Sequence, residues 1–134
     1  MNNLFQINLK NVTKNFEGLD VPVLKNLSFN INASEKVAIL GSSGSGKSTL
    51  LHIIAGLDSP SDGKVLFNNL DMENLSDNKM AKLRNQHIGF VYQSHHLLND
   101  FSSIENVMMP LIVRRGDYLK DLNQAKKVLK KLGL

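Results

Sequence analysis

Apolar and polar residues alternate in two stretches near the start of the chain, residues 4–9 and 27–31, and this period of two predicts strands with one buried face. The run at residues 37–40 is different, because four apolar residues follow one another, as in a strand that is buried on both faces. A short apolar run at residues 65–67 and another at residues 88–92 predict two further strands. All of the predicted strands therefore lie in the first two thirds of the chain.

Helical periodicity replaces the strand pattern at Lys47, where leucines and isoleucines gather on one face until Gly56. A short helix over residues 76–84 follows, with a serine as its N-cap. A third helix is predicted to start at Ser102, because Ser102 and Glu105 have the spacing of a capping box. These elements predict one α/β domain. The last helix sets lysines opposite a face of apolar residues, which are Leu119, Leu122, Ala125, Val128, Leu129 and Leu132.

Composition and charge narrow the function classes. The chain has 134 residues, 42% of them hydrophobic and 21% charged, which is typical of a single folded domain. It contains no cysteine, which excludes disulfides and thiolate metal sites. The net charge of +4 comes from residues 110–134, which contain seven basic residues and two acidic ones. Because this charge lies on one helix and the chain has few aromatic residues, a solvated helix face is favoured over nucleic-acid binding; an anionic lipid surface is the second interpretation.

No apolar stretch approaches the roughly 20 residues that a membrane-spanning helix needs, since the longest one covers residues 107–113. The first three residues carry no basic side chain, and no long apolar stretch follows them as in a secretory signal. We therefore expect a soluble protein of the cytoplasm.

The strongest motif is a glycine-rich stretch that fits the pattern G-x-x-x-x-G-K-[ST] without a mismatch. Its glycines let the chain curl until several backbone N–H groups converge on phosphate oxygens, and the helix that follows directs the positive end of its dipole toward them. Lys47 is placed to neutralise the β- and γ-phosphates, and the Ser48 hydroxyl is placed to ligate Mg²⁺. The predicted nucleotide-binding residues are Gly41, Ser42, Ser43, Gly44, Ser45, Gly46, Lys47, Ser48 and Thr49.

A flexible turn between a strand and a helix would also be rich in glycine and serine. The buried strand predicted before the motif and the apolar helix after it favour a nucleotide site instead. GTPases, nucleotide kinases and transport ATPases all share this loop. The chain has no Asn-Lys-x-Asp sequence of the kind that reads guanine, which argues against a GTPase.

Motifs outside the loop resemble the ATP-binding-cassette (ABC) ATPases. Gln93 ends a predicted strand 46 residues after Lys47, and Phe16 stands where this family places an aromatic ring against adenine. Residues 21–28 are similar to the stretch that leads into the phosphate-loop strand of the family. Three more stretches resemble the ATP-binding subunits of lipoprotein-releasing systems, namely residues 50–58, 89–98 and 105–111.

The resemblance implies a P-loop NTPase fold with an antiparallel β subdomain and the start of a helical subdomain, and it implies ATP and Mg²⁺ as cofactors. It gives Phe16 the role of stacking on adenine, and it gives Gln93 contacts with Mg²⁺ and the attacking water. It also implies a head-to-tail dimer with a second ATP-binding subunit, and integral membrane permease subunits that contact residues 94–110. The implied location is peripheral, on the cytoplasmic face of the bacterial inner membrane.

The sequence departs from the family in several places. Phe16 replaces a commoner tyrosine, Ser34 stands at a position usually held by glycine, and Asn99 at one that is often proline in this subgroup. The sequence also contains no Leu-Ser-Gly-Gly-Gln signature and no apolar strand that ends in Asp-Glu. We therefore interpret residues 1–134 as the N-terminal portion of one ABC ATP-binding domain, and we expect this chain alone not to hydrolyse ATP.

The preferred function is thus that of an ATP-binding subunit that energises the release of lipoproteins from the inner membrane. A related ABC exporter or cell-division ATPase subunit is an alternative, and a non-catalytic fragment that binds nucleotide poorly is another. The pair His95 and His96 suggests a metal site only weakly, because neighbouring side chains diverge and no third ligand is evident. A surface pair is the favoured interpretation.

Overall fold

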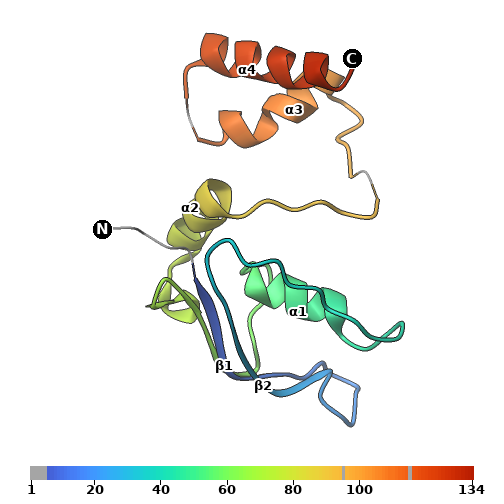
Figure 1. Ribbon diagram of the computed structural model, residues 1–134, viewed down its shortest axis with the longest axis vertical. Coiled ribbons are helices and arrows are strands. Elements are labelled where there is room, and N and C mark those ends of the chain that lie inside the picture. Colours follow the sequence, from blue (N-terminus) through green and yellow to red (C-terminus); the bar gives the residue numbers. More distant parts are fainter. Residues whose placement is uncertain (1–5, 95, 115) are drawn as a thin grey trace. The chain divides into compact units, whose positions relative to one another are not determined.

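A computed structural model of the chain describes residues 6–94, 96–114 and 116–134. The chain divides into two compact units, Met1–Arg84 and Asn85–Leu134. The first unit holds a β-sheet and the helix α1, and the second holds the helices α3 and α4 (Figure 1). Within the described residues, no helix combines the length and the apolar character that a bilayer span requires.

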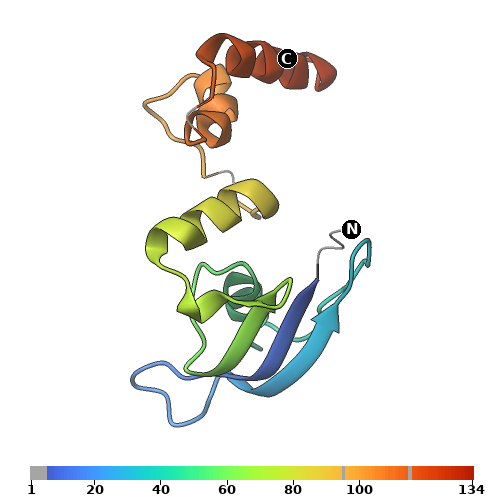
Figure 2. The same ribbon diagram turned by 90° about the vertical axis from the view of Figure 1, so that its left-hand side faces the viewer.

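The first unit is built on an antiparallel four-stranded sheet with the order β2-β1-β3-β4. The strands are β1 (Ile7–Lys14), β2 (Leu24–Ile31), β3 (Asp62–Phe67) and β4 (Leu70–Asp71). Figure 2 shows the sheet with α1 lying across one face. Three predicted strands are confirmed, at 27–31, at 65–67 and over 7–9 of the first stretch; positions 4 and 5 lie outside the described residues.

The core of this unit follows from the alternation along the strands. Leu9 pairs with Phe29 on one side and with Val65 on the other, and Leu9 and Val65 are almost completely buried. Helix α1 (Lys47–Ile54) covers this face with Leu50, Ile53 and Ile54, all buried. The predicted helix at Lys47 is therefore confirmed, and its N-terminus is held at the edge of a packed core.

The C-terminal end of α1 is closed by a glycine and an arginine. Gly56 has a φ of +63°, the left-handed conformation that ends many helices. The Arg84 guanidinium donates a hydrogen bond of 2.6 Å to the carbonyl oxygen of Gly56. Arg84 belongs to α2 (Asp77–His87), which follows the short 3-10 helix η1 (Met72–Asn74) and runs one turn beyond the predicted end at Arg84.

The second unit contains two helices that pack against each other, α3 (Ser103–Ile112) and α4 (Tyr118–Lys131). The capping box predicted for Ser102 and Glu105 is confirmed in both of its hydrogen bonds, and α3 begins at the next residue. Met108 and Ala125 are buried in this unit. The apolar face predicted for α4 is buried only in part, because three of its members are exposed, namely Leu119, Val128 and Leu132.

Two predicted strands are wrong. Residues 37–40 and 88–92 have an extended course without strand hydrogen bonding, and Leu40 and Val91 are 91% and 101% exposed. A strand needs a neighbour to accept and donate its backbone hydrogen bonds, and no described strand pairs with either segment. The two apolar runs therefore do not form strands in the described part of the chain.

Candidate nucleotide-binding site

Two glycines shape the loop between residue 40 and α1. Gly44 and Gly46 have φ values of +77° and +86°, which side chains other than glycine rarely adopt. The loop turns tightly over residues 42–45, since the Ser45 amide donates to the Ser42 carbonyl at 3.3 Å. Gly46 then acts as the N-cap of α1 and accepts a hydrogen bond from the Leu50 amide at 2.8 Å. The loop predicted to bind phosphate thus makes a tight turn at the start of α1, and its contact with phosphate stays a prediction.

Lys47 folds back over this loop. Its Nζ atom donates to the carbonyl oxygens of Gly41 at 3.0 Å and Ser42 at 2.5 Å, and lies 3.4 Å from the Ser45 hydroxyl. All three acceptors are neutral and belong to exposed residues. Phosphate oxygens would form stronger, charge-assisted hydrogen bonds with the same ammonium group. The lysine is therefore held at the loop by partners that an anionic ligand can replace.

The start of α1 suits a triphosphate and its metal ion. The first-turn amides of a helix have no intrahelical acceptor, and no acidic residue lies in the first turn of α1 to repel an anion. Ser48 is exposed in this turn, where its hydroxyl could ligate Mg²⁺ together with phosphate oxygens and water. In the part of the chain that the structure describes, His, Asp and Glu side chains nowhere gather in threes around a common point. The donor set therefore fits a metal ion brought with the nucleotide.

The loop that joins β1 and β2 reaches the same place. A Cβ atom added at Gly46 would lie 2.9 Å from the Val23 carbonyl oxygen, so the two backbones touch. Val23 is in turn tied to the end of β1 by a 2.8 Å hydrogen bond from its amide to the Lys14 carbonyl. Phe16 is part of this connection and is 42% exposed. The geometry leaves the ring accessible, and its role against adenine stays a prediction.

Lys14 is a residue of this region that the sequence reasoning missed. Its Nζ atom pairs with an Asp58 carboxylate oxygen at 2.6 Å and donates to the Ser59 carbonyl at 2.7 Å. The same Nζ lies 5.1 Å from the centre of the Phe16 ring, within reach of a cation–π interaction. Lys14 therefore connects the candidate adenine platform to the end of α1. A single lysine at a strand end gives no sequence signal for such a role.

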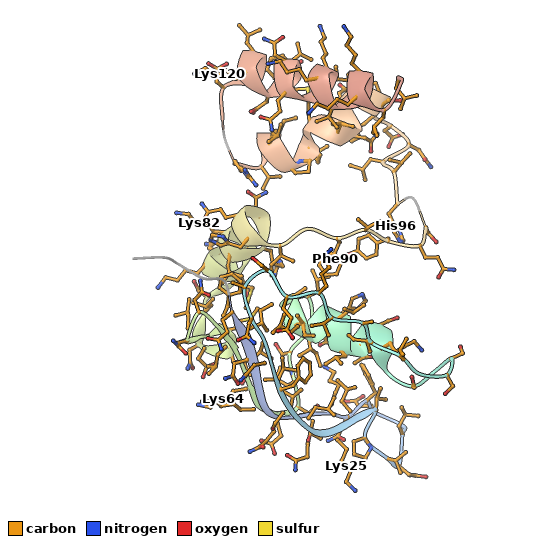
Figure 3. All side chains as sticks on the ribbon, viewed as in Figure 1. Lys25, Lys64, Lys82, Phe90, His96 and Lys120 are labelled. Atoms are coloured by element: carbon orange, nitrogen blue, oxygen red, sulfur yellow. The ribbon has the colours of Figure 1, made fainter. Side chains whose placement is uncertain are left out.

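Gln93 belongs to the second unit, on the extended segment between α2 and α3 that carries Phe90 and His96 in Figure 3. Its side chain is exposed, and its approach to Mg²⁺ stays a prediction. Next to it, the Tyr92 ring stacks on Phe90 at 5.2 Å and meets the His96 ring edge-on at 4.9 Å. His96 is thus engaged with an aromatic ring, and His95 lies outside the described residues.

The segment predicted to contact a permease is organised by Asn106. Its side-chain amide nitrogen lies 3.0 to 3.1 Å from the carbonyl oxygens of Leu98, Phe101 and Ser102, and its amide oxygen accepts from the Leu98 amide. This clamp holds Leu97 and Leu98 in a loop where they are 64% and 46% exposed. Met108 falls within the same segment, but it is 1% exposed and packs in the core of the second unit, so its side chain is not available to a partner.

A family model described as ABC transporter matches residues 24–134. The chain belongs to the ABC transporter family. Two relatives named lipoprotein-releasing system ATP-binding protein LolD are similar to this ABC transporter chain. The protein from Colwellia psychrerythraea is 51% identical over 117 residues, which are 87% of the chain and 45% of the relative. The protein from Coxiella burnetii is 47% identical over 137 residues, which cover all of the chain and 59% of the relative. The chain thus spans about half the length of these relatives.

Solved structures of ABC transporter cassettes have the same fold. One described as the dimeric structure of MJ0796, a bacterial ABC transporter cassette, has a TM-score of 0.86 and 41% identity over 96% of the chain and 57% of its own. A dimeric MJ0796 structure in a post-hydrolysis state with ADP and Pi has a TM-score of 0.85 and 40% identity, with the same coverage. The resemblance to the ABC ATPases and the predicted fold class, the N-terminal part of a P-loop NTPase, are therefore confirmed.

This ABC transporter chain also has a hollow of about 340 Å³ at the other end of α1 from the phosphate loop. Ile53, Val65 and Met72 form its apolar floor, and Glu73 and Arg84 stand at its mouth. Burial and the neighbouring Asp71 carboxylate raise the pKa of Glu73 above its usual value. The Arg84 guanidinium donates one hydrogen bond to the Gly56 carbonyl at this end of α1. The hollow is separate from the nucleotide site.

Proposed function

We propose that the chain is part of the ATP-binding subunit of an ABC transport complex that energises the release of lipoproteins from the bacterial inner membrane. The observation that carries the proposal is the phosphate loop, where Lys47 and the exposed start of α1 converge. Both relatives are named as proteins of a lipoprotein-releasing system, which supports lipoproteins as the cargo. The dimeric cassettes with similar folds support a partnership between two ATP-binding subunits.

The proposed binding mode gives a role to each residue of the candidate site. The Lys47 ammonium leaves the Gly41 and Ser42 carbonyls and pairs with the β- and γ-phosphates, while the amides of the loop and of the first turn of α1 surround the phosphate oxygens. The Ser48 hydroxyl ligates Mg²⁺, whose charge offsets that of the phosphates. The Phe16 ring stacks on adenine, and Gln93 orients the attacking water.

We further propose that the complex is anchored through its permease subunits, so that this chain is peripheral to the cytoplasmic face of the membrane. The docking segment is residues 94–110, where the loop held by Asn106 presents Leu97 and Leu98 to a partner. A rigid loop with exposed leucines loses little entropy when it binds, which favours a specific contact with cytoplasmic helices.

The assignment is tested by removing the one cation of the loop. In Lys47→Ala the phosphates lose charge-assisted hydrogen bonds, each worth about 1.5–3 kcal/mol, so the affinity for ATP should fall tenfold or more. Lys25→Ala is the matched control, because Lys25 is exposed on β2 and projects away from α1 (Figure 3). Isothermal titration calorimetry with Mg²⁺-ATP measures the affinity of each variant for ATP. Equal affinity in Lys47→Ala and the parent chain would refute the nucleotide site.

We propose that the 134-residue chain binds ATP but does not turn it over. Phosphoryl transfer needs a metal held on two sides, a positioned water and charge stabilisation of the transferred group. The printed sequence offers Ser48 and Gln93 for the first two tasks but no Asp-Glu strand end and no signature loop. Losing such stabilisation lowers the rate by about 10³-fold or more. Phosphate release from the parent should therefore equal that of Lys47→Ala, and steady turnover well above this control would contradict the proposal.

A further inference from the structure

Helix α4 carries a row of lysines that the proposed function does not use. With about 100° of rotation per residue, Lys120, Lys127 and Lys131 lie almost in line, and Lys126 and Lys130 lie beside them. The whole set covers an arc of about 140°. Figure 3 shows Lys120 at the outer edge of the α3–α4 pair. The lysines therefore form one continuous strip along the helix, which we call the lysine strip.

The opposite side of α4 fixes the direction of this strip. Ala125 is fully buried, and Leu122 and Leu129, one turn to either side of it, are half-buried. These three residues hold α4 within the second unit, so the arc roughly opposite them is turned outward. All five lysines are exposed accordingly. The lysine strip is thus kept accessible by the packing of the helix.

The charges of the lysine strip are hardly compensated. Among the described residues, only Lys120 lies near a carboxylate, 3.8 Å from Asp117 at the helix start. Lys126, Lys127, Lys130 and Lys131 form no ion pair in the described part of the chain. Lysines near a helix C-terminus are favoured by the dipole, but this accounts for only the last turn. Four parallel cations remain available for an anionic surface.

An exposed leucine adds an apolar anchor. Leu119 is 68% exposed and lies on the helix side of Lys126 and Lys130, seven and eleven residues further on. Its predicted place on the apolar face opposite the lysines is therefore wrong. A flat row of cations with an apolar residue in line matches the face of an interfacial helix, whose leucine enters the headgroup boundary.

We propose that the lysine strip and Leu119 bind the anionic headgroups of the membrane leaflet directly, as a second attachment beside the permease. This inference rests on the proposed location at the membrane but not on the nucleotide site. Each lysine near an anionic surface contributes about fivefold to binding. Four unpaired lysines together should therefore raise binding to anionic vesicles by a hundredfold or more over binding to neutral ones.

The test uses the full chain and vesicles of phosphatidylcholine with or without 30% phosphatidylglycerol, separated by centrifugation. The parent should prefer anionic vesicles, and the preference should fall steeply between 50 and 500 mM salt. The variant with Lys126→Gln, Lys127→Gln, Lys130→Gln and Lys131→Gln should bind them a hundredfold or more weakly. The control variant removes equal charge from the first unit through Lys25→Gln, Lys36→Gln, Lys79→Gln and Lys82→Gln, and it should stay within threefold of the parent.

Two further variants separate membrane binding by the lysine strip from nucleotide binding and from a purely electrostatic attachment. Leu119→Gln should weaken vesicle binding about tenfold without changing the charge. Lys47→Ala should lose ATP and keep vesicle binding, whereas the four-lysine variant should keep ATP affinity and its helical circular dichroism. Equal binding to neutral and anionic vesicles would overturn the proposal, and so would an equal loss in the control variant. Binding to polyglutamate but not to the vesicles would assign the strip to an acidic protein and overturn it as well.

Discussion

Gly44 and Gly46 of the phosphate loop both have a left-handed backbone conformation, but only Gly46 is closely packed. Substituting each in turn therefore distinguishes the cost of backbone strain from the cost of steric contact. Gly44 and Gly46 have similar φ values, +77° and +86°. A Cβ atom at Gly44 would meet nothing within 4 Å, whereas one at Gly46 would lie 2.9 Å from the Val23 carbonyl oxygen and 3.0 Å from a Leu24 methyl carbon. We therefore predict that Gly44→Ala and Gly46→Ala differ in stability, although both place alanine in the same conformation.

The magnitudes follow from the two effects. Alanine in the left-handed region costs about 1–2 kcal/mol, and both variants should lose this amount in the free energy of unfolding. Gly46→Ala must also move the backbone of Val23, and overpacking of this kind costs about 1–3 kcal/mol more. Gly46→Ala should thus be less stable than Gly44→Ala by about 1–3 kcal/mol. Because Val23 leads into β2, the added strain reaches the edge of the sheet.

Urea unfolding followed by circular dichroism at 222 nm measures the difference, since α1 is a main helix of the unit concerned. The chain has no tryptophan, so dichroism is the suitable probe. ATP titration of each folded variant then shows whether the loop still accepts phosphate. Equal unfolding free energies for Gly44→Ala and Gly46→Ala would refute the close approach between the β1–β2 loop and the phosphate loop.

Two further predictions concern the second unit. Hydrogen bonds from the Ser102 hydroxyl and amide lower the pKa of Glu105 below its usual value of 4.5. Their stabilisation is therefore present above pH 4.5 and is lost as the pH falls through the lowered pKa, so Glu105→Gln should flatten the acid side of the unfolding profile; an unchanged profile would contradict the capping box. Cysteines at Asn99 or Ser103 should crosslink to the permease subunit in membranes, and a cysteine at Lys64 on β3 should not; crosslinks from Lys64 alone would reject the docking segment.

Features that depend on neighbours in sequence were predicted well. The capping box of Ser102 and Glu105 needs only a spacing of three residues, and the structure shows both of its hydrogen bonds. The phosphate loop needs glycines where φ is positive and a lysine at the helix start, and the structure has Gly44, Gly46 and Lys47 there. Local chemistry determines such features, so a single sequence is sufficient to find them.

Features that depend on distant partners were predicted poorly. Lys14 meets Asp58 and Phe16 only because β1 and the end of α1 are brought together by the sheet. Met108 falls within residues 94–110, which are predicted to contact a permease, and it is buried because the second unit packs around that side of α3. The pattern of apolar residues within one helix or strand does not predict which other element packs against it.

The two misassigned strands show how the candidate site is held together. Residues 37–40 lead directly into the phosphate loop and residues 88–92 lead directly to Gln93, yet neither segment has a strand partner in the described residues. The loop keeps its shape through other contacts, namely the approach of Gly46 to Val23 and the burial of α1 against the sheet. Gln93 belongs to the other unit, on a segment where the rings of Phe90 and Tyr92 stack at 5.2 Å. The residues proposed to bind phosphate and the residue proposed to position the water therefore belong to different units, so a loss of turnover is compatible with intact ATP binding.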